Sequence, residues 1–196
     1  DASNVCIVVR NNLPIIVYQW TQSGTNAIGC IAYNGTSWST YVVYLGGTYV
    51  QSNPCAVVSL DGTIHVVWSG TDSTDTTQHN IRYSKSTDGG ATWSAAQKLT
   101  SGNTYVQQYP SITADKNNNI YVIFQGKTAT NATYFNIRKI VYINAAWGSI
   151  AELTSQNVAN IQYPQTCANY TDFTDPLCIY QDNQTPAVKF RGVFYA

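Results

Sequence analysis

Short runs of alternating apolar and polar residues follow one another along the chain, separated by polar turns with Asp-Gly, Asn-Asn or Gly-Gly pairs. Alternation with a period of two is typical of strands that have one buried face. From residue 53 to residue 99 it predicts four strands, at about Cys55–Ser59, Thr63–Ser69, Asn80–Lys85 and Thr92–Leu99. Because no stretch has the periodicity of a helix, the pattern predicts an all-β protein.

This strand pattern recurs four times, in segments that begin at Asn4, Asn53, Tyr109 and Tyr163. Each segment has an alternating run, a polar turn and a second run that ends in an aromatic residue: Tyr18, Trp68, Phe124 or Tyr180. A repeat of about 50 residues with four strands is the signature of a propeller blade. We therefore predict a four-bladed β-propeller of four-stranded antiparallel blades, as one domain, 1–196. The blades span about 4–52, 53–108, 109–162 and 163–196.

The fourth repeat reaches only its third predicted strand, so we expect the last blade to lack its outer strand. An open edge of apolar and aromatic residues can pair with a strand of another chain. The candidate assembly edge consists of Val188, Phe190, Val193 and Tyr195. The charged residues Lys189 and Arg191 can prevent such pairing, so a monomer with a protected edge is the alternative.

The stretch "STDGGATW" lies between the third and fourth predicted strands of the second repeat. It resembles the Asp-box, or BNR, motif of sialidase-like propellers, with matches at Ser86, Asp88, Gly90, Thr92 and Trp93. A turn aspartate accepts hydrogen bonds from nearby backbone amides, and glycines permit positive φ. We therefore expect this motif to clamp a hairpin and to have no part in catalysis.

The resemblance implies that sialidase chemistry is one possibility. That chemistry uses three converging arginines, a pair formed by a tyrosine and a glutamate, and an aspartic acid. The arginines are Arg10, expected in a turn, Arg82 and Arg138 on third strands towards the rim, and Arg191. Glu152 is the single glutamate and falls on an outer strand. We therefore expect no sialidase activity. His65 and His79 lack a nucleophile-like neighbour, and Asp72 and Asp75 lack a complete metal-ligand set, so we interpret them as structural.

Ten basic and ten acidic residues give a net charge of zero over 196 residues. This composition argues against nucleic acid or an anionic membrane as partner, and it leaves little repulsion between copies of the chain. The chain begins at Asp1, contains no Met and has no run that could span a membrane, which predicts an exported, mature protein. Sequons at Asn34, Asn131, Asn169 and Asn183 permit glycosylation.

Five cysteines fit an oxidising compartment. Cys167 and Cys178 flank the turn "YTDFTD", so we expect them to form a disulfide across a hairpin. The partners of Cys6, Cys30 and Cys55 stay open. No spacing suggests zinc, and we expect neither a metal nor a cofactor.

Together these features favour a secreted, non-enzymatic structural subunit that assembles with copies of itself into a filament, sheath or surface layer. A lectin-like glycan-binding or adhesion module is the alternative. A sialidase-like glycosidase is the third hypothesis.

Overall fold

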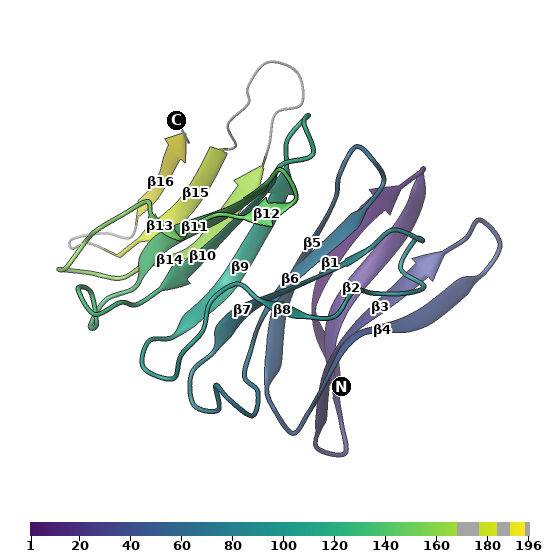
Figure 1. Ribbon diagram of the computed structural model, residues 1–196, viewed down its shortest axis with the longest axis horizontal. Coiled ribbons are helices and arrows are strands. Elements are labelled where there is room, and N and C mark those ends of the chain that lie inside the picture. Colours follow the sequence, from purple (N-terminus) through teal and green to yellow (C-terminus); the bar gives the residue numbers. More distant parts are fainter. Residues whose placement is uncertain (168–176, 184–188, 195–196) are drawn as a thin grey trace.

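The computed structural model describes residues 1–167 and 177–183 and the backbone of residues 189–194 (Figure 1). These described residues form strands and turns and no helix, which confirms the predicted all-β class. Their strands make four antiparallel sheets, one for each sequence repeat.

The sheets follow the chain in order. The first contains β1 (Ala2–Arg10), β2 (Leu13–Gln22), β3 (Thr25–Tyr33) and β4 (Trp38–Gly47), and the second β5 (Gln51–Val58), β6 (Ile64–Gly70), β7 (Asn80–Ser86) and β8 (Gln97–Lys98). The third contains β9 (Gln107–Ala114), β10 (Ile120–Gly126) and β11 (Asn136–Ile143), with β12 (Ala146–Trp147) and β13 (Ala151–Glu152) both paired to β11. The fourth contains β14 (Ile161–Cys167), β15 (Leu177–Asp182) and β16 (Lys189–Phe194).

The outer strand of the second sheet is shorter than the sequence predicted. β8 covers only two residues of the expected strand Thr92–Leu99. The N–H of Thr92 donates to the carboxylate of Asp88, and the indole of Trp93 donates to the carbonyl of Gly90. These two residues therefore belong to the preceding turn and do not join the ladder.

Successive sheets pack face to face, so that β1, β5, β9 and β14 lie next to one another in that order (Figure 1). An apolar cluster fills each of the three interfaces. Trp68 and Phe124, two of the aligned aromatic residues, are completely buried in these clusters. Their large side chains fill the space between two twisted sheets.

The first sheet has one uncovered face. On β1, Cys6 and Val8 pack towards the second sheet, whereas the alternate residues Val5, Ile7 and Val9 are 60%, 63% and 59% exposed. In a closed ring every sheet packs against two others, so the fourth sheet would cover this face. Closure of the predicted four-bladed ring is therefore not confirmed.

The fourth sheet has three strands in the described part of the chain, with the backbone of β16 at its edge. The absence of an outer strand from the last blade stays a prediction. Of the candidate assembly edge, Val188 and Tyr195 lie outside the described residues, and only the backbone of Phe190 and Val193 is described. A role of this edge in assembly stays a prediction.

The predicted disulfide does not fit the strand register. Cys167 pairs with Leu177, and Cys178 pairs with Thr166. Because neighbouring residues of a strand point to opposite faces, this offset of one residue separates the two sulfur atoms. Cys167 is accordingly exposed and Cys178 buried.

Arg10 is the last residue of β1 and does not lie in a turn, which corrects the sequence prediction. Its Nε donates to the carbonyl of Gly62 at 2.7 Å, and its Nη2 donates to that of Thr87 at 3.3 Å. The arginine thus ties the first sheet to two turns of the second.

Candidate functional site

The first strand of each sheet is interrupted by a β-bulge near its start. The bulges occur at equivalent places of the four repeats. In the last three repeats a proline stands there, namely Pro54, Pro110 and Pro164. Proline has no N–H for the ladder, which favours an interruption of strand pairing.

A left-handed residue stands at each of these bulges. The φ angle is 48° at Asn4, 53° at Asn53, 52° at Tyr109 and 53° at Tyr163. Asparagine tolerates this conformation, whereas for a bulky residue such as tyrosine it costs about 1–3 kcal/mol. Backbone strain of this kind persists only where the surrounding structure enforces it, and it is concentrated at functional sites.

In three of the repeats, the backbone N–H of this left-handed residue donates a hydrogen bond to a side chain of the preceding sheet. Gln19 Oε1 accepts the N–H of Asn53 at 3.0 Å, Ser69 Oγ that of Tyr109 at 3.1 Å, and Gln125 Oε1 that of Tyr163 at 2.9 Å. Each acceptor immediately follows an aligned aromatic residue of the repeat. The second strand of one sheet thus fixes the bulge of the next.

The four bulges surround one cavity of about 300 Å³, which we call the first-strand cavity. It is lined by Asn4, Val5, Cys6, Asn53, Pro54, Cys55, Tyr109, Pro110, Tyr163, Pro164 and Gln165. The rings of Tyr109 and Tyr163 meet edge to face, with centroids 5.0 Å apart. Tyr163 is 46% exposed. No charged residue is among these lining residues, so the cavity offers aromatic faces, amides and thiols.

The two thiols of the cavity wall interact with each other. The pKa of Cys6 is lowered, first by a hydrogen bond from the Cys55 thiol and also by the N–H of Ala56, which lies 3.3 Å from the Cys6 sulfur. The pKa of Cys55 is raised by the same thiol contact and by burial. Proton loss is therefore easier at Cys6. The sequence alone assigned no partner to Cys6 or to Cys55, although the two residues occupy the same position in the first and second repeats.

The Asp-box-like stretch lies at the turn after β7 and not at the cavity. The two oxygens of Asp88 accept from the hydroxyls of Ser86 and Thr92, at 2.8 Å and 2.6 Å, and from the Thr92 N–H at 2.9 Å. Gly90 donates to Ser86 Oγ, and its φ of 97° lies in the left-handed region. Trp93 packs into the core between the first two sheets. These contacts are those of a structural clamp.

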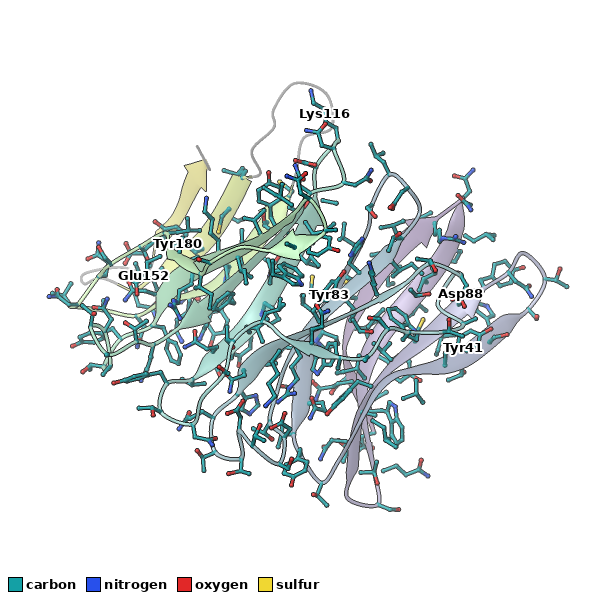
Figure 2. The ribbon with its side chains drawn as sticks, in the orientation of Figure 1. Tyr41, Tyr83, Asp88, Lys116, Glu152 and Tyr180 are labelled. Atoms are coloured by element: carbon teal, nitrogen blue, oxygen red, sulfur yellow. The ribbon has the colours of Figure 1, made fainter. Side chains whose placement is uncertain are left out.

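A buried hydrogen-bonded chain surrounds His65. The hydroxyl of Ser59 donates to Asp61 at 2.6 Å, so its oxygen accepts the Nε2–H of His65 at 3.0 Å. The Nδ1 of the ring then accepts from the hydroxyl of Tyr83 at 2.7 Å, near the middle of the molecule (Figure 2). Burial lowers the pKa of His65 to about 4. The sequence reasoning missed Ser59, which becomes a neighbour because β5 and β6 form a hairpin.

The acidic loop of the second sheet forms ion pairs. Asp72 Oδ2 lies 3.0 Å from Arg82 Nη2 and 2.9 Å from Lys98 Nζ, and Asp75 Oδ2 lies 3.1 Å from Lys98 Nζ. Arg82 is 2% exposed. The loop thus neutralises two cations of its own sheet. Among the residues that the structure describes, no cluster of His, Cys, Asp or Glu has the size that a metal ion needs.

The sequons differ in accessibility. Asn34 is exposed, and its side-chain oxygen accepts the N–H of Thr36 and of Ser37. Asn131 is buried, and Asn183 is half-buried, with its amide donating to Gln162 at 3.3 Å. Asn169 lies outside the described residues. In the described ranges, no helix is long and apolar enough to cross a membrane.

No protein-family model and no curated protein matches the chain. Solved structures do match. A protein of unknown function from Dyadobacter fermentans DSM 18053 has a TM-score of 0.71 at 13% identity, over 96% of this chain and 51% of that chain. A Hadza microbial sialidase has a TM-score of 0.68 at 15% identity, over 98% and 44% of the two chains. An α-L-arabinanase from Penicillium chrysogenum, complexed with arabinobiose, has a TM-score of 0.64 at 10% identity, over 92% and 56%. The chain therefore spans about half the length of these structures.

These matches correct the functional expectation. The sequence favoured a non-enzymatic structural subunit, whereas two of the matched structures are glycoside hydrolases. That expectation rested on a low charge and an open edge, and both are compatible with other roles. At 10–15% identity the likeness shows the fold, which is a β-propeller of the sialidase and arabinanase type.

Proposed function

We propose that the chain is a carbohydrate-active β-propeller protein that binds a glycan in the first-strand cavity and processes it. The observation that carries the proposal is the pair of left-handed tyrosines at the cavity, Tyr109 and Tyr163. The left-handed backbone of these tyrosines is unfavourable in free energy. Three hydrogen bonds from backbone N–H groups of the bulges to side chains of the preceding sheet hold the arrangement in place.

The chemistry of the cavity suits a sugar. Tyrosine rings offer flat apolar faces to sugar C–H groups and hydroxyls to sugar oxygens. The amides of Asn4, Asn53 and Gln165 supply both donors and acceptors, as a ring of hydroxyl groups requires. The cavity of about 300 Å³ lies in the size range of small-molecule sites, and its polar and apolar surfaces are of similar extent.

The assignment to the Asp-box class of sialidase-like propellers is part of this proposal. The clamp around Asp88 and its place after a third strand support it. Export from the cell, where extended glycans are found, also belongs to the proposal.

The test screens wild-type protein against a panel of oligosaccharides for binding and for release of new sugar ends. A positive glycan is then titrated against Tyr163→Ala and Tyr109→Ala. We expect each variant to bind about tenfold more weakly. Trp38→Ala is the matched control, because Trp38 is an exposed aromatic residue outside the cavity. The proposal fails if no glycan binds, or if both tyrosine variants bind as the wild type does.

A further inference from the structure

Two arginines, Arg82 (buried) and Arg138 (half-buried), occupy the same position in successive sheets. Arg82 of β7 pairs with Trp68, and Arg138 of β11 pairs with Phe124, the next aligned aromatic residue. The neighbouring hydrogen bonds also correspond. Gln51 Nε2 donates to the carbonyl of Thr71 at 2.9 Å, and Gln107 Nε2 donates to that of Lys127 at 2.8 Å. The two sites can therefore be compared residue by residue.

In the second sheet a carboxylate of the chain itself lies beside the arginine. Asp72 Oδ2 is 3.0 Å from Arg82 Nη2. The other oxygen of Asp72 accepts the N–H of Asp75 at 2.9 Å, which fixes the loop. Asp72 thus shows where a carboxylate is stable next to this arginine position.

In the third sheet Thr128 stands where the second has Asp72. Thr128 Oγ1 accepts the N–H of Asn131 at 3.1 Å, as Asp72 does for Asp75. The threonine carries no charge, and a cavity of about 300 Å³ lies in front of Arg138, which we call the Arg138 pocket. It is lined by Ser101, Gly102, Thr104, Tyr105, Gln107, Lys127, Thr128, Ala129 and Arg138.

The Arg138 guanidinium keeps unused binding capacity. Its Nη1 donates to Gln107 Oε1 at 3.1 Å, whereas its Nε is buried and, like the Nε of Arg82, has no hydrogen-bond partner in the described part of the chain. No carboxylate within that part lies at ion-pair distance from it. Lys127 adds a second cation to the pocket wall.

We propose that the Arg138 pocket binds the carboxylate of an acidic glycan, such as a chain of uronic acid residues. The ligand carboxylate takes the place that Asp72 fills in the second sheet. Arginine is suited to this role because its planar guanidinium binds carboxylates with two parallel hydrogen bonds. The assignment to a glycan rests on the proposed function.

The pocket and the first-strand cavity are close along the chain. Gln107 lines the pocket and Tyr109 lines the cavity, and two residues of a strand span about 7 Å. In this proposal the neutral part of the glycan lies on the tyrosines and its carboxylate on the arginine.

Glu152 is the alternative partner of Arg138. It lies opposite Arg138 in the register of β13 and β11 and is exposed, on the left of Figure 2. Burial lowers the pKa of Arg138, and the charge of Glu152 opposes this shift. A glutamate that served as the counter-ion would make an added carboxylate unnecessary, so the test includes Glu152→Gln.

Calorimetric titrations compare trigalacturonate, its neutral methyl ester and acetate as ligands. We expect wild-type protein to bind the acid about tenfold more tightly than the ester. Arg138→Gln and Thr128→Asp should remove this preference, the second because it supplies the carboxylate that the second sheet already has. Lys116→Gln, a change at an exposed turn residue outside the pocket, should keep the preference. We also expect Thr128→Asp to melt at a higher temperature than the wild type. This measurement establishes whether the variant is folded.

Several results would overturn the inference: equal binding of acid and ester, no binding of any of the three ligands, or a preference that survives both Arg138→Gln and Thr128→Asp. No acid preference in the wild type, together with a preference in Glu152→Gln, would identify Glu152 as the counter-ion instead. Acetate that binds as tightly as trigalacturonate would exclude a glycan as the specific ligand. Ester binding that depends on Tyr163, without acid preference, overturns this inference alone and leaves the proposed function standing.

Discussion

The side-chain oxygen of Gln125 accepts the backbone N–H of Tyr163 at 2.9 Å and so connects the third sheet to the bulge of the fourth. Gln125 is completely buried. Its contact holds a left-handed tyrosine at the wall of the first-strand cavity. The stability of the fold and the shape of the site therefore depend on the same hydrogen bond.

Replacement of this acceptor should destabilise the protein. In Gln125→Leu the partly buried N–H of Tyr163 loses its acceptor, and we expect a loss of about 1–2 kcal/mol in the free energy of unfolding, measured by urea denaturation. Gln181→Leu is the control, because the Gln181 amide donates to Asn183 in its own sheet. Equal stability of Gln125→Leu and the wild type would show that the clamp does not hold the bulge.

Asp88→Ala should weaken the turn after β7 without an effect on ligand binding. The hydroxyl of Thr92, the N–H of Thr92 and the hydroxyl of Ser86 lower the pKa of Asp88 to about 2. A depressed carboxyl pKa stabilises the fold above the unfolded value near 3.8, and this contribution is lost as the pH falls through 2. We expect a loss of about 1 kcal/mol at pH 7 that shrinks below pH 4, measured by thermal unfolding. Loss of glycan binding with unchanged melting would contradict the structural role.

His65 should make the protein acid-sensitive. Burial lowers its pKa from 6.5 to about 4, so the unfolded chain takes up a proton in this range before the folded chain does. The corresponding stability is fully present above pH 6.5 and is lost as the pH falls to 4, by up to about 3 kcal/mol. His65→Gln, which keeps a donor and an acceptor, should show a flatter stability profile between these values. The same slope in the variant would assign the effect to other groups.

Cys6 should be more reactive near neutral pH than the buried thiols. The hydrogen bond from Cys55 lowers the pKa of Cys6, and the thiolate is the nucleophile. We expect iodoacetamide to modify Cys6 before buried Cys30, and Cys55→Ala to shift the reaction of Cys6 to higher pH, as followed by mass spectrometry at several pH values. An unchanged pH profile in Cys55→Ala would show that the thiol pair does not exist in solution.

The sequence predicts the sheets because local periodicity and a fourfold repeat determine them. It also predicts the clamp around Asp88, since a turn of seven residues contains all of its partners. It did not predict the uncovered face of the first sheet, because contacts between sheets depend on their twist. It failed for Cys167 and Cys178, because a register offset of one residue reverses a side chain's direction.

The candidate site was harder to predict than the fold. Prolines recur at the bulges of three repeats, but they do not reveal the left-handed tyrosine before two of them. The clamp from Gln125 to Tyr163 joins residues 38 positions apart, so no local pattern reveals it. The repeats align Asp72 with Thr128, so the loss of a carboxylate is visible in the sequence. Its consequence for binding follows only from the structure, which places Arg82 beside Asp72 and Arg138 in the same pocket wall as Thr128.

The most direct test of a glycan site in the first-strand cavity is a titration followed by amide chemical shifts in NMR, with an oligosaccharide that binds in the screen. The account predicts saturable shifts concentrated at Asn4, Asn53, Tyr109 and Tyr163, with no comparable shifts in the turn around Asp88. Saturable shifts that cluster elsewhere and leave these four amides unchanged would contradict it.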